Sequence, residues 1–353
     1  MKLLLAGGGT AGHCVPNLAL LPNLKKYFTD IRYLGTEKGI ERALVTPYGL
    51  TYYPIRTPKL VRGVSFRAIK NNLAIPFSLA RAKKRCVKIL QEFQPDAVFL
   101  KGGFVCLPVA LACKKLKIPC VIHESDYSFG LANRLCLPFA KKILTAFPQT
   151  AKKNKRALFV GAPLREELFF VSKSKGRARY GFTTEKRVLL VLGGSSGAHG
   201  LNARVKDALP HLLKEFQVLH IVGKKEPLPE KREGYVPIAY EGEMAYAYAA
   251  ADLAISRAGA NALFELTALN VPTLAVPLPT GRGDQKENAR YFAEKGAILQ
   301  AEESTLTCKT LLTRLHELIA KTPVLQRNML ALKHTEACGR IAKELVAVAK
   351  RGN

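Results

Sequence analysis

The feature that most constrains this chain is a structural motif that occurs twice. Residues 2–13, KLLLAGGGTAGH, and residues 188–200, VLLVLGGSSGAHG, each run from an apolar strand into a glycine turn and on to a histidine. A strand, a glycine turn and a helix start leave backbone N–H groups that can face a phosphate. Two copies of the motif predict two Rossmann-like domains in tandem.

Short β-rich runs alternate with longer helical stretches in both halves, which is typical of parallel sheets covered by helices. We therefore expect an α/β chain of two doubly wound parallel-sheet domains that face a cleft. Gly161 and Pro163 interrupt the pattern, so the first domain is expected over 1–162 and the second over 163–339. An amphipathic helix within 340–353 can pack back on the first domain. The predicted strands are Lys2–Ala6, Ile31–Leu34, Ala97–Leu100, Pro119–Ile122, Ile143–Ala146, Leu158–Val160, Val188–Leu192, Val218–Val222, Leu253–Ser256 and Pro272–Val276.

Length and composition agree with this organisation. A chain of 353 residues exceeds the size at which single cores stop growing, and 48% apolar residues exclude wholesale disorder. No run approaches the roughly 20 apolar residues of a membrane span, and the N-terminus enters a strand directly, so we expect a cytoplasmic protein that does not span a membrane. Eight scattered cysteines without a Cys-x-x-Cys pair are interpreted as buried, reduced thiols.

The net charge of +28 is concentrated in the first half, where residues 1–162 hold 27 Lys and Arg against 7 Asp and Glu. No acidic residue occurs between Glu41 and Glu92, and basic residues alternate with apolar ones across 56–90. This pattern suggests a surface that meets anionic lipid headgroups while apolar side chains enter the interface. The alternative is a solvated helix face above an ordinary core stripe. Nucleic acid is not expected, because no helix-turn-helix, RNP-like or zinc-finger pattern is present.

The first glycine loop leaves two interpretations open. Gly7-x-Gly9-x-x-Gly12 fits a dinucleotide site, for which the nearest carboxylate after the second strand is Glu37. A nicotinamide dehydrogenase needs one such loop, however, and the duplication argues against it. His13, which follows the glycines at once, is either a general base at the cleft or a residue that orients the loop.

The second half offers parts of a nucleotide-sugar site. Ser195 and Ser196 lie in the second glycine turn, where they either meet a diphosphate or cap a helix. In ISRAGANALFEL, the carboxylate of Glu265 can accept two ribose hydroxyls or lie in solvent on its helix. Gln285 and Asn288, three residues apart, share a helix face from which amides can bind sugar hydroxyls.

Taken together, the motifs GGGTAGH, KGGFVCLPVALA, HESDYSFGLANR, GGSSGAHG, ISRAGANALFEL and GDQKENA resemble, in order and spacing, those of the peptidoglycan N-acetylglucosaminyltransferases of glycosyltransferase family 28. This resemblance covers about 300 residues. It implies the GT-B fold, UDP-N-acetylglucosamine as donor and inversion at the anomeric carbon, with no cofactor and no metal. It also implies that the first loop faces the lipid acceptor and the donor sugar.

Carried over by position, the resemblance assigns site residues. His13 matches the candidate base for the 4-hydroxyl of the acceptor. Asp126 stands where many members have asparagine and is a further candidate contact with the donor sugar, and uracil is expected near Glu241–Gly242. The other donor contacts that the resemblance implies are Thr10, Ala11, Gly12, Arg165, Ser195, Ala260, Asn261, Glu265 and Gln285.

The expected function is a single inverting displacement that converts lipid I, an undecaprenyl-diphosphate acceptor, into lipid II. The expected partners are UDP-N-acetylglucosamine, lipid I and the anionic lipids of the inner leaflet, which region 56–90 contacts. Such an enzyme is peripheral to the cytoplasmic face of the cell membrane and serves cell wall biogenesis, cell shape and cell division. The alternatives are a UDP-N-acetylglucosamine 2-epimerase of the same fold and a non-catalytic lipid or nucleic-acid binder.

Overall fold

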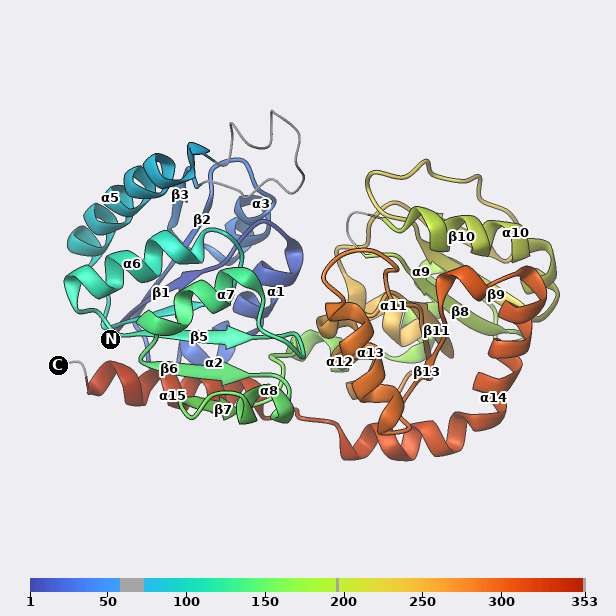
Figure 1. The fold of residues 1–353 in the computed structure, drawn as a ribbon. Coiled ribbons are helices and arrows are strands. Elements are labelled where there is room, and N and C mark those ends of the chain that lie inside the picture. The colour runs from blue at the N-terminus through green and yellow to red at the C-terminus, as the bar shows by residue number, and fades with distance from the viewer. Residues whose placement is uncertain (58–72, 195–196, 352–353) are drawn as a thin grey trace. The chain divides into compact units, whose positions relative to one another are not determined.

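The chain forms two compact units, which are described separately. The structure is a computed structural model that describes residues 1–57, 73–194 and 197–351. Unit 1 holds residues 1–165 and 336–353, and unit 2 holds residues 166–335. The chain therefore crosses from one unit to the other twice. Both units are helix-covered parallel sheets (Figure 1), which confirms the expected fold class.

Unit 1 is built on seven parallel strands in the order β3-β2-β1-β4-β5-β6-β7. In the register of the central strands, Leu3 of β1 lies opposite Ile31 of β2 and Ala97 of β4. The strands are β1 (Lys2–Ala6), β2 (Asp30–Thr36), β3 (Tyr52–Ile55), β4 (Ala97–Leu100), β5 (Cys120–Glu124), β6 (Lys142–Thr145) and β7 (Ala157–Phe159). The helices are α1 (Ala11–Ala19), α2 (Leu21–Leu24), α3 (Glu41–Val45), η1 (Thr46–Tyr48), α5 (Ile75–Phe93), α6 (Cys106–Leu116), α7 (Leu131–Cys136), η2 (Leu137–Phe139), α8 (Pro148–Lys152) and α15 (Ala337–Lys350).

The strands of unit 1 are buried on both faces, which explains why β1 is a continuous apolar run. Side chains alternate along a strand, so Leu3 and Leu5 join the core beneath α1, α2 and α15. Leu4 and Ala6 join the opposite core, beneath α5 and α6. A parallel strand covered by helices on both faces has no solvent side on which to place polar residues.

Unit 2 repeats this plan with six parallel strands in the order β10-β9-β8-β11-β12-β13. Leu189 and Val191 of β8 pack under α10 and α14, and Leu190 packs on the other face, under α9 and α11. The strands are β8 (Arg187–Leu192), β9 (Phe216–Ile221), β10 (Tyr235–Ile238), β11 (Leu253–Ser256), β12 (Thr273–Ala275) and β13 (Leu299–Gln300). The helices are η3 (Glu166–Phe169), α9 (Lys173–Tyr180), α10 (His199–Glu215), α11 (Met244–Ala250), α12 (Ala260–Ala268), α13 (Asp284–Glu294), η4 (Glu303–Thr305) and α14 (Cys308–Ala331).

Each sheet changes direction of winding at one point, and both glycine loops lie there. In unit 1 the reversal falls between β1 and β4, and in unit 2 it falls between β8 and β11. In open parallel sheets, the crevice outside the carboxyl ends of the strands at this reversal is where ligands bind. The topology therefore places the repeated motif at the expected binding edge of each sheet.

The helix α15 packs on unit 1, along the face that carries α2 (Figure 1). The units divide at 165/166 and 335/336, whereas the sequence predicted 162/163 and 339/340. The difference has a packing cause, because Leu164 is buried and its carbonyl oxygen lies 3.4 Å from the Cys338 thiol. Ion pairing of Lys142 with Glu344 also ties α15 to β6.

Three further observations complete the fold. The structure contains β3, β10 and β13, three edge strands that the sequence did not predict. All eight cysteines are free thiols, and all except Cys308 are buried. Among the described residues, no helix is both long enough and apolar enough to cross a bilayer.

Candidate active site

The first glycine loop connects β1 to α1 and packs backbone to backbone against the loop after β4. The N–H of Gly8 donates to the carbonyl oxygen of Gly102 over 3.3 Å. A Cβ atom at Gly103, which has φ +85°, would lie 2.0 Å from the carbonyl oxygen of Gly8. Only glycine permits this approach, so KGGF and GGGTAGH together form one structural unit at the reversal of the sheet.

A carboxylate of the chain itself fills the turn of the first loop. Glu41, from α3, is fully buried and accepts hydrogen bonds from the N–H of Gly9 and from the Thr36 hydroxyl, the latter over 2.8 Å. An N–H bonded to a buried carboxylate is not available to a phosphate. This bond argues against the dinucleotide interpretation of the loop, and Glu37, its candidate carboxylate, pairs with Arg56.

His13 lies in the first turn of α1, half-buried beside both loops. Its Nδ1 is 3.1 Å from the carbonyl oxygen of Gly8 and 3.1 Å from the Thr10 hydroxyl. A carbonyl oxygen can only accept, so the bond to Gly8 requires the tautomer with the proton on Nδ1. Nε2 then carries a lone pair, which is the form that a general base needs. Ala11 and Gly12 precede His13 in the same turn.

Lys101 joins this loop pair to the HESDYSFGLANR segment. It follows β4, is buried, and its ammonium donates to the Ser125 hydroxyl. Burial lowers the pKa of Lys101 to about 8, because removal from water disfavours the charged form, although Glu124 and Asp126 oppose this effect.

Glu124 holds the segment that carries Asp126. Its buried carboxylate accepts from the N–H of Asp126 over 3.0 Å, from the N–H of Gly130 over 2.9 Å and from the Asn133 amide over 2.8 Å. Asp126 itself is half-buried at the carboxyl edge of β5. The structure thus gathers Thr10, Ala11, Gly12, His13 and Asp126 at one edge of unit 1.

The second glycine loop connects β8 to α10 at the corresponding edge of unit 2. Gly194 and Gly197 have φ values of +87° and +90°, which glycine adopts without strain. Ser195 and Ser196, the expected phosphate contacts, lie outside the described residues. The phosphate role of Ser195 therefore stays a prediction.

Glu265 projects from α12, the helix that begins with Ala260 and Asn261 after β11. Its Oε2 accepts a hydrogen bond of 2.8 Å from the hydroxyl of Tyr248, a buried residue of α11. This contact fixes the carboxylate instead of leaving it mobile in solvent. The sequence motif identified Glu265 but gave no signal for Tyr248, which lies on a different helix.

The two amides of α13 hold neighbouring loops. The Gln285 side-chain oxygen accepts from the N–H of Leu278 over 2.9 Å. Asn288 is fully buried, and its amide donates to the carbonyl oxygen of Ala258 over 3.2 Å. This hydrogen bond ties Asn288 to the loop before α12, and its predicted contact with sugar hydroxyls stays a prediction. Gln285 is only half-buried.

A buried arginine connects segments at the carboxyl ends of the strands of unit 2. The Arg257 guanidinium donates to the carbonyl oxygens of Val276 and Pro277 over 3.2 and 3.3 Å, and it pairs with Glu303. Because this pair lies largely out of solvent, removal of either partner alone would leave an uncompensated charge. Nothing in the sequence motif distinguished Arg257 from a surface residue.

Comparison with known proteins decides the family. The N-terminal domain model of glycosyltransferase family 28 matches residues 3–145, and the C-terminal domain model matches residues 188–345. This chain belongs to glycosyltransferase family 28. The predicted family and GT-B fold are therefore confirmed, and the chain is an enzyme of the glycosyltransferase class.

The relatives of this family 28 chain match it over most of its length. A protein of Lachnoclostridium phytofermentans is 45% identical over 88% of both chains, and one of Oceanobacillus iheyensis is 40% identical over 99% of both. Each is named UDP-N-acetylglucosamine--N-acetylmuramyl-(pentapeptide) pyrophosphoryl-undecaprenol N-acetylglucosamine transferase.

Solved structures agree with the assignment to glycosyltransferase family 28. The crystal structure of Acinetobacter baumannii MurG superposes with a TM-score of 0.72 at 26% identity, covering 98% of this chain and 99% of that one. A UDP-GlcNAc 2-epimerase from Neisseria meningitidis gives a TM-score of 0.69 at 14% identity, covering 98% of this chain and all of that one. This second similarity shows a shared fold alone.

Arg165 of this family 28 enzyme lies differently from expectation, whereas Glu241 and Gly242 lie in a way that suits a contact through the backbone alone. Arg165 is the last residue of the first segment of unit 1, whereas the sequence placed it in the second domain. The Glu241 carboxylate turns inward, where it accepts 2.7 Å bonds from the Tyr180 hydroxyl and the N–H of Glu243. The adjoining Gly242 is exposed, so only the backbone is presented at that position.

Proposed function

We propose that this chain transfers N-acetylglucosamine from UDP-N-acetylglucosamine to the 4-hydroxyl of the N-acetylmuramyl-pentapeptide of undecaprenyl-diphosphate lipid I, giving lipid II. The observation that carries the proposal is the 40% identity to an enzyme named for this transfer over 99% of both chains. The topology supports it, since both switch points carry the loops that a two-domain transferase needs.

Unit 2 is proposed to bind the donor. The carboxylate of Glu265, held by Tyr248, is oriented to accept the two ribose hydroxyls, and the backbone at Gly242 is open to the uracil. Ala260 and Asn261 begin the helix α12 beside the ribose, while Gln285 offers an amide to the sugar. Ser195 is proposed to contact the diphosphate, on which negative charge develops as it leaves, and so is Arg165, although it belongs to unit 1.

Unit 1 is proposed to supply the base. The acceptor hydroxyl attacks C1 of N-acetylglucosamine, its proton passes to Nε2 of His13, and the bond from C1 to the diphosphate oxygen breaks. Because attack and departure occur on opposite faces in one step, the configuration at C1 inverts. The hydrogen bond from Nδ1 of His13 to Gly8 supports this role, since it stabilises the tautomer that can accept the proton.

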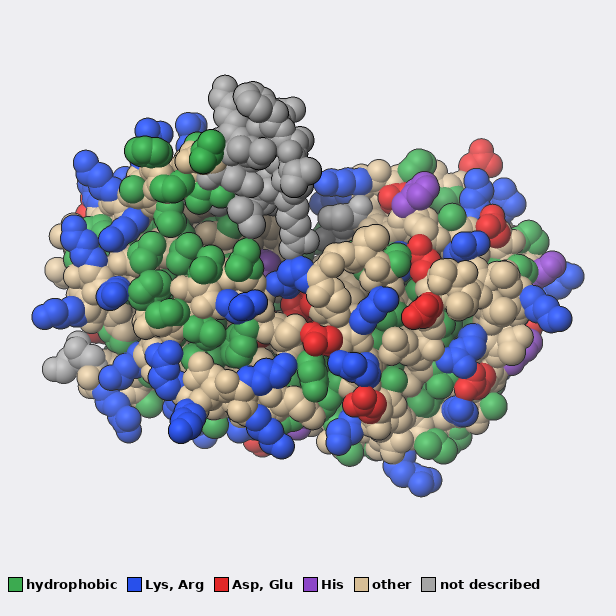
Figure 2. All heavy atoms as spheres, viewed as in Figure 1, with side chains coloured by type: hydrophobic (Ala, Val, Ile, Leu, Met, Phe, Trp, Pro, Cys, Tyr) green, Lys and Arg blue, Asp and Glu red, His purple; other side chains and the backbone are tan. Residues whose placement is uncertain are grey.

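Unit 1 is also proposed to dock on anionic lipids at the cytoplasmic face of the membrane. Residues 58–72 of the basic region lie outside the described residues, but α5 continues it. Phe77 is 81% exposed, and Leu131 and Leu135 of α7, at 45% and 48%, add a second exposed apolar stripe. In Figure 2 hydrophobic side chains gather over α5, α6 and α7, with Lys and Arg around them. This combination suits an anionic interface.

The transfer assay tests the function directly. Purified protein is incubated with UDP-N-acetylglucosamine labelled in the sugar, with and without a lipid I analogue. We expect label in the lipid fraction and equimolar UDP, both dependent on acceptor. A 2-epimerase would instead convert the sugar without acceptor and leave the lipid unlabelled. That result would overturn the proposal.

A further inference from the structure

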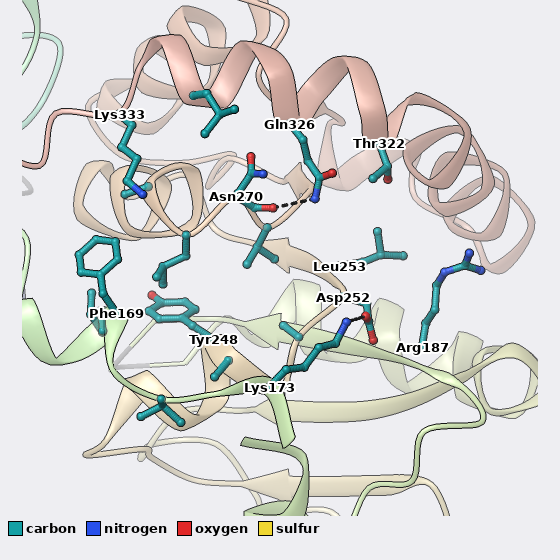
Figure 3. A pocket seen from close by; sticks show the side chains of 18 of the residues that line it. Phe169, Lys173, Arg187, Tyr248, Asp252, Leu253, Asn270, Thr322, Gln326 and Lys333 are labelled. Carbon is teal, nitrogen blue, oxygen red and sulfur yellow. Dashed lines mark hydrogen bonds and ion pairs between the residues drawn. The ribbon is translucent and has the colours of Figure 1, made fainter. Parts of the chain in front are cut away.

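Unit 2 contains a cavity at the edge of the sheet opposite its glycine loop. The cavity has a volume of about 820 Å³. It is lined by residues at the amino ends of strands, including Arg187 at the start of β8, Leu253 at the start of β11 and Val271 just before β12. The helix α14 covers it through Thr322, Gln326 and their neighbours (Figure 3). The motifs at the carboxyl edge have no part in it.

The charged groups of this cavity leave an excess of positive charge. The Asp252 carboxylate accepts 2.7 Å bonds from the N–H of Val188 and from Arg177, and it also pairs with Lys173. Its charge is therefore already compensated. Arg187 and Lys333 lie at different ends of the lining, on β8 and beyond α14, as Figure 3 shows. Asp252 is the only carboxylate among the described lining residues, so a ligand that enters between these two cations meets net positive charge.

Aromatic and aliphatic side chains form part of the wall between the cations, beside the polar side chains of Asn270, Thr322 and Gln326. Phe169 and Tyr248 contribute rings, and Leu269, Ile319 and Leu330 contribute aliphatic side chains. The Lys333 ammonium lies 5.1 Å from the centre of the Phe169 ring, so cation and ring are presented together. A pocket of this size, with rings beside a few cations, matches a molecule that has a flat apolar body and a negative group.

The cavity is connected to the proposed nucleotide site by two physical links. The ring of Tyr248 lines the cavity, while its hydroxyl donates to Glu265 over 2.8 Å. The helix α12 begins at Ala260, beside the proposed ribose site, and its last residue, Ala268, lines the cavity. A ligand that restrains Tyr248 and the end of α12 would restrain Glu265 as well.

We propose that this cavity is an effector site for an aromatic organic anion, and that its occupation tightens nucleotide binding through Tyr248 and α12. That the cavity binds an aromatic anion is argued from the cavity alone. That this binding tightens the nucleotide site rests on the proposed role of Glu265, so binding and coupling are measured separately. Tightening is expected because a carboxylate that is already ordered loses less freedom when the ribose binds.

Binding is tested with 8-anilinonaphthalene-1-sulfonate, which has an aromatic body and one sulfonate, by fluorescence titration of the whole protein. We expect one saturable site, weakened at least about fivefold by the double change Arg187→Gln and Lys333→Gln, since the sulfonate loses its charged contact with whichever cation it meets and the cavity loses two positive charges. The matched control is Lys321→Gln with Arg327→Gln, which removes the same charge from α14 outside the cavity lining. Absence of a saturable site, or equal affinity in both double variants, would overturn the site.

Coupling is tested by calorimetric titration with UDP, with and without saturating probe. We expect the Kd for UDP to fall about fivefold, within the usual range of coupling between sites. In Tyr248→Phe the ring remains, so the probe still binds, but the effect on UDP is largely lost. An unchanged or raised Kd in the wild type overturns the coupling and leaves the cavity as a binding site. Failure of the wild type to bind UDP at all would instead refute the proposed function.

Discussion

Glu265 is the residue on which nucleotide binding is expected to depend most directly. Replacement by alanine removes a carboxylate that Tyr248 holds at 2.8 Å and that is proposed to accept two ribose hydroxyls. We expect Glu265→Ala to weaken UDP binding by about 1–3 kcal/mol, the usual scale for hydrogen bonds to a charged group. Calorimetric titration with UDP measures this. The control is Glu294→Ala on α13, an exposed carboxylate; equal UDP affinity in Glu265→Ala and the control would remove Glu265 from the site.

His13 is expected to affect turnover more than nucleotide affinity. If Nε2 accepts the proton of the acceptor, His13→Ala should lower turnover about 10²–10⁴-fold, the usual contribution of a general base. The Kd for UDP should change little, because the nucleotide is proposed to bind unit 2. His211→Ala, on the exposed side of α10, is the control. Turnover within a few-fold of wild type would leave His13 with only the role of ordering its loop.

Lys101 should make stability depend on pH in a predictable direction. Its pKa is about 8 in the folded chain, against an ordinary value of 10.5 for a lysine in water, so between these values the unfolded chain binds more protons. The free energy of unfolding should therefore rise with pH across this window, relative to Lys101→Met, by up to about 3 kcal/mol. Below pH 8, Lys101 is charged in both the folded and the unfolded chain, so the folded chain bears the whole free-energy cost of removing the ammonium from water. Urea unfolding at pH 7.5 and 10 tests this.

The exposed Lys115 of α6 provides the control for that measurement. Lys115→Met should leave the same difference between pH 7.5 and 10 as the wild type. A parallel pH dependence in wild type and Lys101→Met would show that burial does not shift the titration of Lys101.

At the residue scale, the sequence identified side chains that lie inside motifs and missed those that arrive from elsewhere. His13 and Glu265 stand shortly after glycine turns, so local pattern was enough to select them. Glu41 reaches Gly9 from 32 positions away, and Tyr248 reaches Glu265 from 17. Such contacts arise only when separate elements pack together, and no hydrophobic periodicity or local motif in the sequence predicts them.

At the element scale, the strands that the sequence missed are all at sheet edges. Two of them, β3 and β10, contain a proline, Pro54 and Pro237 respectively. Proline removes one N–H from the ladder and is tolerated where one side of the strand has no partner. β13 has only two residues. The central strands, in contrast, are continuous apolar runs because helices cover both faces, and they were predicted within a few residues.

The helix α15 is expected to contribute strongly to the stability of unit 1. Leu345 is fully buried in the core that also holds Leu3 and Leu5 of β1. Leu345→Ala removes three carbon atoms and leaves a cavity, which should lower the free energy of unfolding by about 2–5 kcal/mol. Urea denaturation followed by circular dichroism measures the loss. Lys343→Ala, on the exposed side of α15, should change stability little, since alanine is at least as good a helix former as lysine; a similar loss in both variants would show that the buried cavity is not its cause.

At the scale of the whole molecule, the asymmetry of charge is expected to govern attachment to membranes. Arg81, Lys83, Lys84 and Arg85 lie on α5 in the acid-free stretch. Their replacement by glutamine should cost several kcal/mol of binding to anionic vesicles, at about 1 kcal/mol per basic residue. High salt should reduce the difference. UDP binding should stay intact, and activity should fall for acceptor in vesicles more than for a short-chain soluble acceptor. Co-sedimentation with vesicles is the measurement.

A variant with the same change of charge on unit 2 provides the control for that prediction. Lys206, Lys214, Lys225 and Lys231, all exposed, are replaced by glutamine instead. If only total charge matters, both variants lose vesicle binding equally, and the docking surface is not on α5. If neither loses it, the basic residues of α5 are a solvated helix face.

The return of the chain to unit 1 through α15 has a consequence for its biosynthesis. A ribosome makes β1 first, but the side of β1 that carries Leu3 and Leu5 is covered by Ile341 and Leu345, which are made after the whole of unit 2. Unit 2 is continuous and can finish folding while unit 1 still exposes an apolar face. Synthesis of unit 1 therefore begins first and its folding is completed last. Chaperones that bind nascent chains are expected to cover the exposed apolar face of unit 1 until α15 has been made.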